Sequence, residues 1–422
     1  MTADTTTTTT TATADRGVRA ADPVVTGIGV TAPNGLGTEA WWSAVLRGES
    51  GIRPVSRFDT AQYPAKLAGE VPGFDAAEHI PGRLLPQTDH MTRLALTAAD
   101  EALADAGVDV AALPDFSAGV ITASSAGGFE FGQKELQALW SKGGQYVSAY
   151  QSFAWFYAVN TGQISIKNGL RGPSGVLVTE QAGGLDAVAQ ARRQLRRGVR
   201  LLVTGGVDSS ICPWGWAAHL AGGELTAEED PDRAYLPFSA DAAGHVAGEG
   251  GALLVLETAD SARERGATVY GSVAGYASTF DPAPGSGGTP RLQAAAELAL
   301  REAGLTPADV DVVFADAAGR RSADRDEARA IAALFGDYGV PVTAPKTMTG
   351  RLAAGGASLD LAAALLALRD QVLPPTVNVG PPAADCPIDL VTEVRRPDRL
   401  RTALVLARGR GGFNAAMVVR AA

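Results

Sequence analysis

Cysteine and histidine are scarce in this sequence. Its 422 residues include two cysteines, Cys212 and Cys386, and four histidines. The cysteines are far apart and neither belongs to a C-x-x-C pair, which argues against a disulfide scaffold and a structural zinc site. His245 and Glu249 have the spacing of a helical metal pair, but the glycines around them oppose a helix. We therefore expect no bound metal and a reducing compartment, the cytoplasm.

Long apolar runs and a positive net charge are also missing. No run reaches the about 18 apolar residues of a membrane-spanning helix. Residues 1–22 are rich in threonine and lack the apolar segment of a secretory signal, so we expect a disordered leader with little to bury. The formal net charge of −10 argues against nucleic-acid and anionic-membrane partners.

Apolar runs and helical patterns alternate along the rest of the chain, which predicts an α/β fold. The alternation continues in the same style past residue 260. We therefore expect two similar halves, residues 23–260 and 261–422. A loose dinucleotide fingerprint begins at Gly27, but the turn Pro33-Asn34-Gly35 stands where that motif needs a helix. We expect no cofactor.

The segment from Val176 to Arg197 is the most informative part of the chain. Its apolar start, Val176 to Thr179, predicts a strand, and its remainder predicts a helix that ends at Gly198. Gln181 would lie at the turn between them, at the positive end of the helix, where a nucleophilic cysteine is activated. An amide cannot attack a carbonyl, so the local sequence alone favours a helix cap.

Two further patterns have alternative explanations. The arginines from Arg192 to Arg200 would line one side of a helix, as a solvated face or as a docking surface for an acidic partner. The aromatic cluster from Phe153 to Tyr157 indicates either core or an interface.

Several motifs resemble the thiolase-like β-ketoacyl synthases, from about Pro23 to the C-terminus. The matching stretches are Val25-Thr26-Gly27-Ile28-Gly29, Pro237 to Gly251, Pro345-Lys346-Thr347-Met348-Thr349-Gly350, Leu373-Pro374-Pro375-Thr376 and the closing Gly-Gly-Phe-Asn. The resemblance implies a thiolase-like fold, two α/β halves in a layered α-β-α-β-α arrangement. In that family a cysteine accepts the acyl chain, and two histidines and a lysine support decarboxylation and condensation.

This sequence departs from the family at three of those four catalytic positions. Gln181 stands in place of the cysteine, and Ala318 and Arg351 stand in place of the histidines, while Lys346 is retained. Without a thiolate no acyl-enzyme forms. Without imidazoles the stabilisation of the malonyl-derived enolate is missing. Condensation is therefore excluded for this chain on its own.

One subfamily has this pattern, the chain length factor, or ketosynthase β subunit, of type II aromatic polyketide synthases. The segments that resemble it are Ala154 to Gln163, Glu180 to Asp186, Cys212 to Trp216 and Asp232 to Phe238. The resemblance implies a heterodimer with a ketosynthase α subunit, an acyl carrier protein that brings malonyl and polyketide chains, and a tunnel whose length this subunit limits.

The resemblance maps the residues that gate chain length to Phe129, Gly132 and Leu136. Their spacing of three and four places them on one helix face, where ordinary core packing is the alternative. Glycine within a helix costs about 1 kcal/mol relative to alanine. Because Gly132 removes side-chain volume, we predict a longer product than that of relatives with bulkier residues.

Two other functions compete with this interpretation. The first is a malonyl-carrier-protein decarboxylase that supplies the acetyl primer, in which Gln181 hydrogen-bonds the thioester carbonyl. The absence of both histidines weakens it. The second is a scaffold without a polyketide role. The sequence does not give the exact chain length, the starter unit or the final product.

Overall fold

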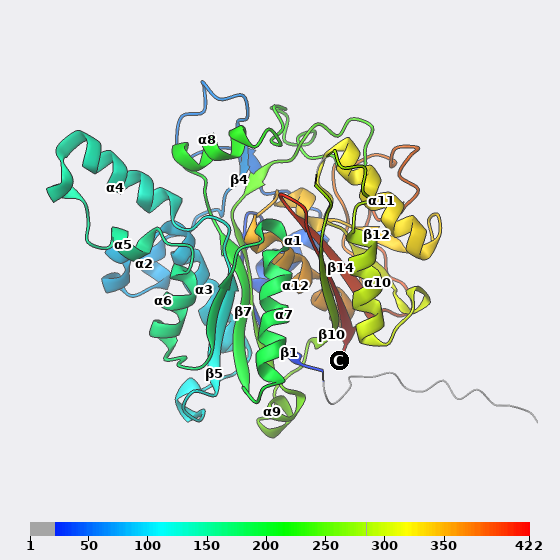
Figure 1. Ribbon diagram of the computed structural model, residues 1–422, viewed down its shortest axis with the longest axis horizontal. Helices are drawn as coiled ribbons and strands as arrows, with labels where there is room; N and C mark the ends of the chain where they lie inside the picture. Colours follow the sequence, from blue (N-terminus) through cyan, green and yellow to red (C-terminus); the bar gives the residue numbers. More distant parts are fainter. Residues whose placement is uncertain (1–21, 284) are drawn as a thin grey trace, which may run out of the picture.

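The computed structural model describes residues 22–283 and 285–422, and one mixed sheet runs through them (Figure 1). In spatial order, the strands of its N-terminal half are β6 (Ser174–Leu177), β5 (Ala118–Ala123), β7 (Leu201–Asp208), β9 (Gly250–Glu257) and β1 (Val24–Ala32). The corresponding strands of its C-terminal half, also read from the outside of the sheet towards its centre, are β12 (Pro341–Thr343), β11 (Val312–Phe314), β14 (Thr402–Gly409), β15 (Phe413–Ala421) and β10 (Gly271–Phe280).

The two halves repeat one topology. With these five strands numbered along the chain, both halves have the spatial order 3-2-4-5-1. In each half the third, second and fourth strands are parallel, and the fifth is antiparallel to its two neighbours. The halves join where β1 pairs with β10. This duplication confirms the predicted α/β, thiolase-like fold class.

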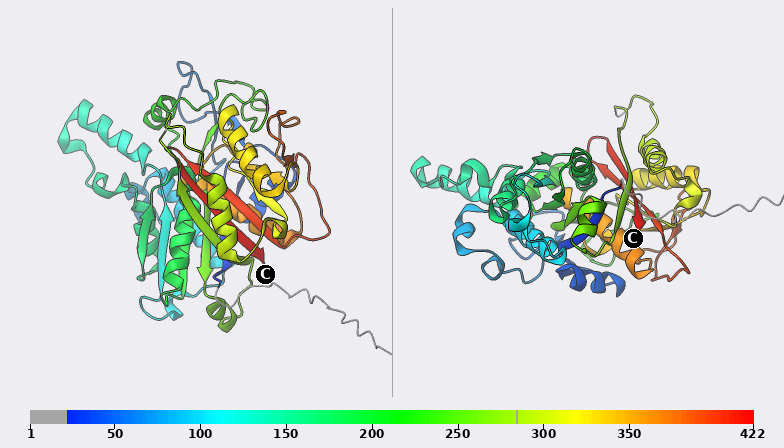
Figure 2. Two further views of the ribbon diagram at one scale, coloured as in Figure 1. Left: turned by 45° about the vertical axis from the view of Figure 1, so that its right-hand side comes forward. Right: turned by 90° about the horizontal axis from the view of Figure 1, so that it is seen from below.

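The helices complete the predicted five layers (Figure 2). Helix α3 (His90–Asp105) covers the outer face of the N-terminal half of the sheet. Helices α10 (Leu292–Ala303) and α11 (Arg321–Phe335) cover the C-terminal half. Between the halves, α7 (Gly183–Leu195) packs against α12 (Ala354–Asp370). Helix α12 is buried from Ala354 to Leu368, as expected for a helix that is apolar on all sides.

Close packing explains the glycines at the start of α7. A Cβ atom on Gly184 would lie 2.6 Å from the backbone nitrogen of Ser358 in α12. The strand before α7 ends at Leu177, two residues earlier than predicted, and Glu180 has a φ of 51°. A short 3-10 turn, Glu180–Ala182, therefore separates strand from helix and contains Gln181.

A projecting segment, which we call the arm, comprises α4 (Phe129–Lys142), α5 (Gln151–Ala154) and the loop to Ala158. It extends away from the layers in both figures (Figure 1, Figure 2). Helix α4 ends at Lys142, before Gly143, whose φ of 110° stops it. The exposed aromatic residues of the arm are Trp140, Tyr146, Tyr150, Trp155, Phe156 and Tyr157. Their exposure rules out the core explanation for these side chains.

The remaining elements are shorter and connect these layers. The helices are α1 (Thr38–Leu46), α2 (Ala76–His79), α6 (Val159–Asn168), α8 (Pro213–Ala221) and α9 (Ala259–Glu264). The strands are β2 (Gly35–Leu36), β3 (Ile52–Pro54), β4 (Leu67–Gly69), β8 (Ala247–Gly248) and β13 (Asp389–Leu390). Apart from Asp22, the predicted leader lies outside the described residues. Within 22–283 and 285–422, the helices are too short or too polar to cross a membrane.

Candidate functional site

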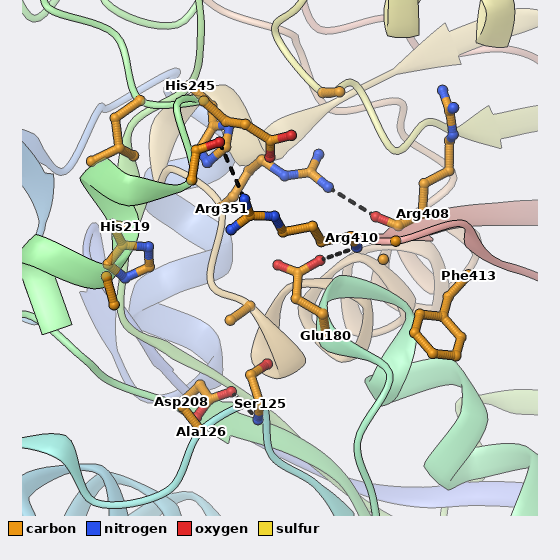
Figure 3. A pocket seen from close by; sticks show the side chains of 18 of the residues that line it. Ser125, Ala126, Glu180, Asp208, His219, His245, Arg351, Arg408, Arg410 and Phe413 are labelled. Carbon is orange, nitrogen blue, oxygen red and sulfur yellow. Dashed lines mark hydrogen bonds between the residues drawn. The ribbon is translucent and has the colours of Figure 1, made fainter. Parts of the chain in front are cut away.

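A cavity of about 330 Å³ lies where the two halves meet (Figure 3). Glu180 contributes from the turn before α7, and Ala318 and Arg351 contribute from the C-terminal half. Phe129 of α4 and Phe413 at the start of β15 complete the apolar part of the wall. Two of the three substituted catalytic positions therefore face the same space.

Gln181 is at the predicted turn but does not line this cavity. Its side chain is fully buried and packs against Gly356 near the start of α12, where an added Cβ would lie 2.0 Å from Nε2. Neither amide atom has a hydrogen-bond partner among the described residues. The neighbouring Glu180 faces the cavity instead, and its carboxylate accepts the backbone N–H of Arg410 at 2.9 Å. No motif or spacing singled out Glu180 in the sequence.

Arg351 is held in a buried ion pair. Its guanidinium donates to both carboxylate oxygens of Asp316, at 3.2 and 3.1 Å, and to the carbonyl oxygens of Asp316 and Arg408, at 2.8 and 3.2 Å. Burial opposes ionisation of Asp316, but the charges of Arg351, Lys346 and Arg408 together outweigh it and lower the pKa of Asp316. Ala318, the other substituted position, adds only a methyl group to the wall.

Lys346 is also buried and paired. Its Nζ atom lies 2.7 Å from the carboxylate of Asp360 and donates to the carbonyl oxygen of Asp316 at 3.0 Å. Burial raises the pKa of Asp360, although the charge of Lys346 opposes that shift. The retained lysine does not line the cavity itself, but it is hydrogen-bonded to Asp316, which does.

Two histidines that the sequence analysis did not select do line the cavity. His219 of α8 is hydrogen-bonded through Nε2 to the hydroxyl of Ser210 at 2.8 Å. Burial lowers the pKa of His219 to about 4 and that of His245 well below its ordinary value, so both are neutral at pH 7. They come from elements other than those carrying Ala318 and Arg351, and no spacing in the sequence connects them.

The three predicted gating residues lie along α4 in different surroundings. Phe129 lines the cavity, and its ring centroid lies 4.8 Å from that of Trp214 in α8. Gly132 is buried, and a Cβ there would lie 3.0 Å from Cζ3 of the same indole. Leu136 is 37% exposed. The face therefore runs from the cavity, past Trp214, to the exposed surface of the arm.

Trp214 contacts Phe129 and Gly132 of α4, and the sequence did not predict this contact. It follows Pro213 at the start of α8, and its backbone N–H donates to Oε1 of Gln133 in α4 at 2.7 Å. The Pro-Trp-Gly-Trp motif was the available signal. Only the fold brings it against α4.

The basic run from Arg192 to Arg200, at the end of α7 and in the loop after it, is engaged largely within the chain. Arg192 is buried and donates to Glu302 at 2.7 Å and to the carbonyl of Ala274 at 3.0 Å. Arg196 also pairs with Glu302, and Arg200 pairs with Glu264. These contacts favour a structural explanation over a docking surface.

Comparison with known proteins gives consistent similarities. The beta-ketoacyl synthase N-terminal domain matches residues 21–262, and the corresponding C-terminal domain matches residues 270–380. The chain is 61% identical, over 94% of its length and 98% of the relative, to the tetracenomycin polyketide synthase ketoacyl synthase beta subunit of Streptomyces glaucescens. It is 58% identical, over 94% and 98%, to the actinorhodin polyketide putative beta-ketoacyl synthase 2 of Streptomyces coelicolor.

Solved structures give the same picture. The ishigamide ketosynthase/chain length factor superposes with a TM-score of 0.84 and 27% identity, over 95% of this chain and 99% of that one. A type II polyketide synthase acyl-carrier protein in complex with its ketosynthase, bound to the hexaketide, gives a TM-score of 0.84 and 26% identity over the same shares.

Proposed function

The chain belongs to the β-ketoacyl synthase family, and from this premise we propose how it acts as a ketosynthase β subunit, or chain length factor. It is a non-condensing member that pairs with a ketosynthase α subunit of a type II polyketide synthase. It sets the length of the poly-β-ketone in aromatic polyketide biosynthesis, of the kind that yields antibiotics or pigments. An acyl carrier protein delivers the malonyl units.

The observation that carries this proposal is the state of the former catalytic cavity. Arg351 faces the cavity and is held in an ion pair with Asp316, while the position that the family resemblance assigns to the nucleophile holds a buried amide, Gln181, outside the cavity wall. Ala318 has no polar group. A family member that keeps the fold but lacks an acyl-accepting side chain contributes by shaping space, not by forming the carbon–carbon bond.

Exposed surface supports the pairing with an α subunit. Among the residues that the structure describes, strand β6 ends the sheet and pairs only with β5, so its outer edge is open to another chain. Beside it, Ile166 is 76% exposed and Val178 is 47% exposed. The arm adds the exposed aromatic residues named above. Apolar surface of this kind marks a protein interface.

The gating proposal follows from the path of the α4 face. Phe129 opens on the cavity and Leu136 opens on the arm surface that the partner would cover. A polyketide that enters at the heterodimer interface would therefore meet Phe129, the Gly132–Trp214 contact and Leu136. Side-chain volume along this row would limit how far the chain extends.

The test is reconstitution with a ketosynthase α subunit, carrier protein and malonyl donor, with mass analysis of the polyketides. Replacing this subunit by a relative that makes a shorter product should shorten the product, while the α subunit stays the same. A product length that follows the α subunit alone would refute the proposal.

The second candidate function, decarboxylation of malonyl carrier protein through Gln181, is favoured by the unpaired Gln181 amide. The test compares carbon dioxide release by the wild-type dimer and by Gln181→Ala. A lower rate in the variant supports decarboxylation through the amide, and equal rates remove Gln181 from the chemistry.

A further inference from the structure

Helix α4 begins without a capping side chain of its own. Its N-cap residue is Gly128, and the N–H groups of a first helical turn need acceptors from outside the helix. The N–H of Phe131 donates to Oδ2 of Asp89 at 2.7 Å. The acceptor comes from a residue 42 positions earlier in the chain.

Asp89 caps a second helix at the same time. Its Oδ1 atom accepts the N–H of Met91 at 2.8 Å, in the first turn of α3. Two positively polarised helix ends thus converge on one carboxylate, which is 2% exposed. Helix α3 is anchored in the core through fully buried side chains such as Leu94 and Leu96. Asp89 therefore connects the arm to the rigid part of the molecule.

The contact between the start of α4 and Asp89 is tightly packed. A Cβ on Gly128 would lie 2.8 Å from Cβ of Asp89 and 2.3 Å from the carbonyl oxygen of Ala154. The N–H of Gly128 donates to the carbonyl of Trp155 at 3.0 Å. Elsewhere α4 packs mainly on α5, α8 and the turn Gly144–Tyr146. The position of its first turn is thus set where Gly128 meets Asp89.

We propose that Asp89 is a positioning residue for chain-length selection, which acts by fixing the first turn of α4. Phe131 lies between Phe129 and Gly132, so the hydrogen bond from its N–H to Asp89 sets where both stand against Trp214. This inference rests on the proposed gating function of the α4 face. It adds a determinant that lies outside the row of residues facing the polyketide.

Asp89→Asn tests the proposal with little change of shape. An asparagine amide has one acceptor oxygen, so one of the two helix N–H groups would face an NH₂ donor. Gly128→Ala tests it independently, because the added Cβ pushes the first turn of α4 away from an intact carboxylate. Asp75→Asn and Gly144→Ala are the matched controls. Asp75 caps only α2, and a Cβ on Gly144 would meet only Leu139, at 4.0 Å.

The measurement is the distribution of polyketide lengths made by each variant in complex with its α subunit and carrier protein. We expect both test variants to raise the share of products other than the principal one by about threefold or more, since small displacements at a positioned site have large effects. The controls should keep the wild-type distribution. A folded, assembled Asp89→Asn complex with the wild-type distribution would overturn the proposal.

Assembly of the complex and a third test variant, Gly132→Leu, decide the remaining outcomes. If Asp89→Asn fails to assemble, the product distribution of Gly128→Ala decides for or against the positioning role. If neither assembles and Gly144→Ala does, Asp89 serves folding alone and the proposal falls. Gly132→Leu separates this inference from the proposed function. If it shifts product length while Asp89→Asn does not, only the positioning role is lost. If it shifts nothing, the gating function itself is lost.

Discussion

Enlarging Gly132 is the most direct test of the space along α4. A Cβ at this position would lie 3.0 Å from Cζ3 of Trp214, whereas carbon atoms in contact prefer about 3.5–4.0 Å. Leucine adds three further carbons, so the indole must move. Trp214 is 39% exposed and has solvent on one side into which it can turn. The leucine and the displaced indole would then occupy the path of the polyketide.

The expected cost in stability is small enough for the fold to survive. Overpacking typically costs about 1–3 kcal/mol, and replacing a helical glycine returns about 1 kcal/mol. The net loss of up to about 2 kcal/mol is within the usual margin of a folded domain. We therefore expect a folded Gly132→Leu subunit whose principal product is shorter by at least one two-carbon unit.

The assay is mass analysis of polyketides from the reconstituted complex, with thermal unfolding measured on the same samples. Gly144→Leu is the matched control, because it makes the same substitution in the arm away from Trp214. An assembled Gly132→Leu complex that makes the wild-type product in wild-type proportions would refute the reasoning. So would an equal shift in Gly144→Leu, since that would trace the effect to the arm in general.

Three further predictions concern stability. Gln181→Leu should raise the free energy of unfolding by about 1–2 kcal/mol in denaturant titrations, because it removes two unpaired buried polar atoms; a loss of stability would indicate a hidden partner for the amide. Arg351→Met should lower it by about 3–5 kcal/mol by leaving Asp316 buried and unpaired, and a neutral result would mean that Asp316 is protonated. Burial would raise the pKa of Glu249, but the charges of His90 and Arg57 lower it to about 2. The ionised Glu249 therefore adds about 3 kcal/mol to the free energy of unfolding above pH 4.5, and this contribution is lost as the pH falls toward 2. Glu249→Gln should therefore flatten the decline of stability between pH 4.5 and 2, and identical slopes would contradict this.

Local sequence patterns predicted the elements, and the family resemblance indicated the substituted positions, but neither predicted the contacts between them. The turn at Gln181 and the helix from Phe129 follow from spacing and turn residues. The 3-10 turn that buries Gln181 depends on its packing against Gly356, which is distant in sequence. In the same way, the pairing of Asp316 with Arg351 spans 35 residues, and no periodicity reports it.

The α4 face shows where a family pattern and the observed packing diverge. The spacing of Phe129, Gly132 and Leu136 correctly predicted one helix face. The sequence also predicted that the missing side chain of Gly132 enlarges a tunnel, a prediction that remains untested. In the structure, the indole of Trp214 stands against Gly132, so volume at the two positions has to be considered together.

The ion pair between Arg351 and Asp316 lies at the cavity, at the position where the family resemblance places a histidine. Helices α7 and α12 occupy equivalent places in the two halves and share the central core, so the cavity at their N-terminal ends is a consequence of packing. Without Arg351 the carboxylate of Asp316 would be buried without its cation, at a cost of about 3–5 kcal/mol, which is a large part of the stability of a folded domain. Arg351 supplies that cation, and the N–H of Arg408 donates to the same carboxylate, while Lys346 donates to the backbone carbonyl oxygen of Asp316. Restoring a histidine at position 351 would therefore not restore the site by itself, because the same change would remove the cation that keeps Asp316 ionised.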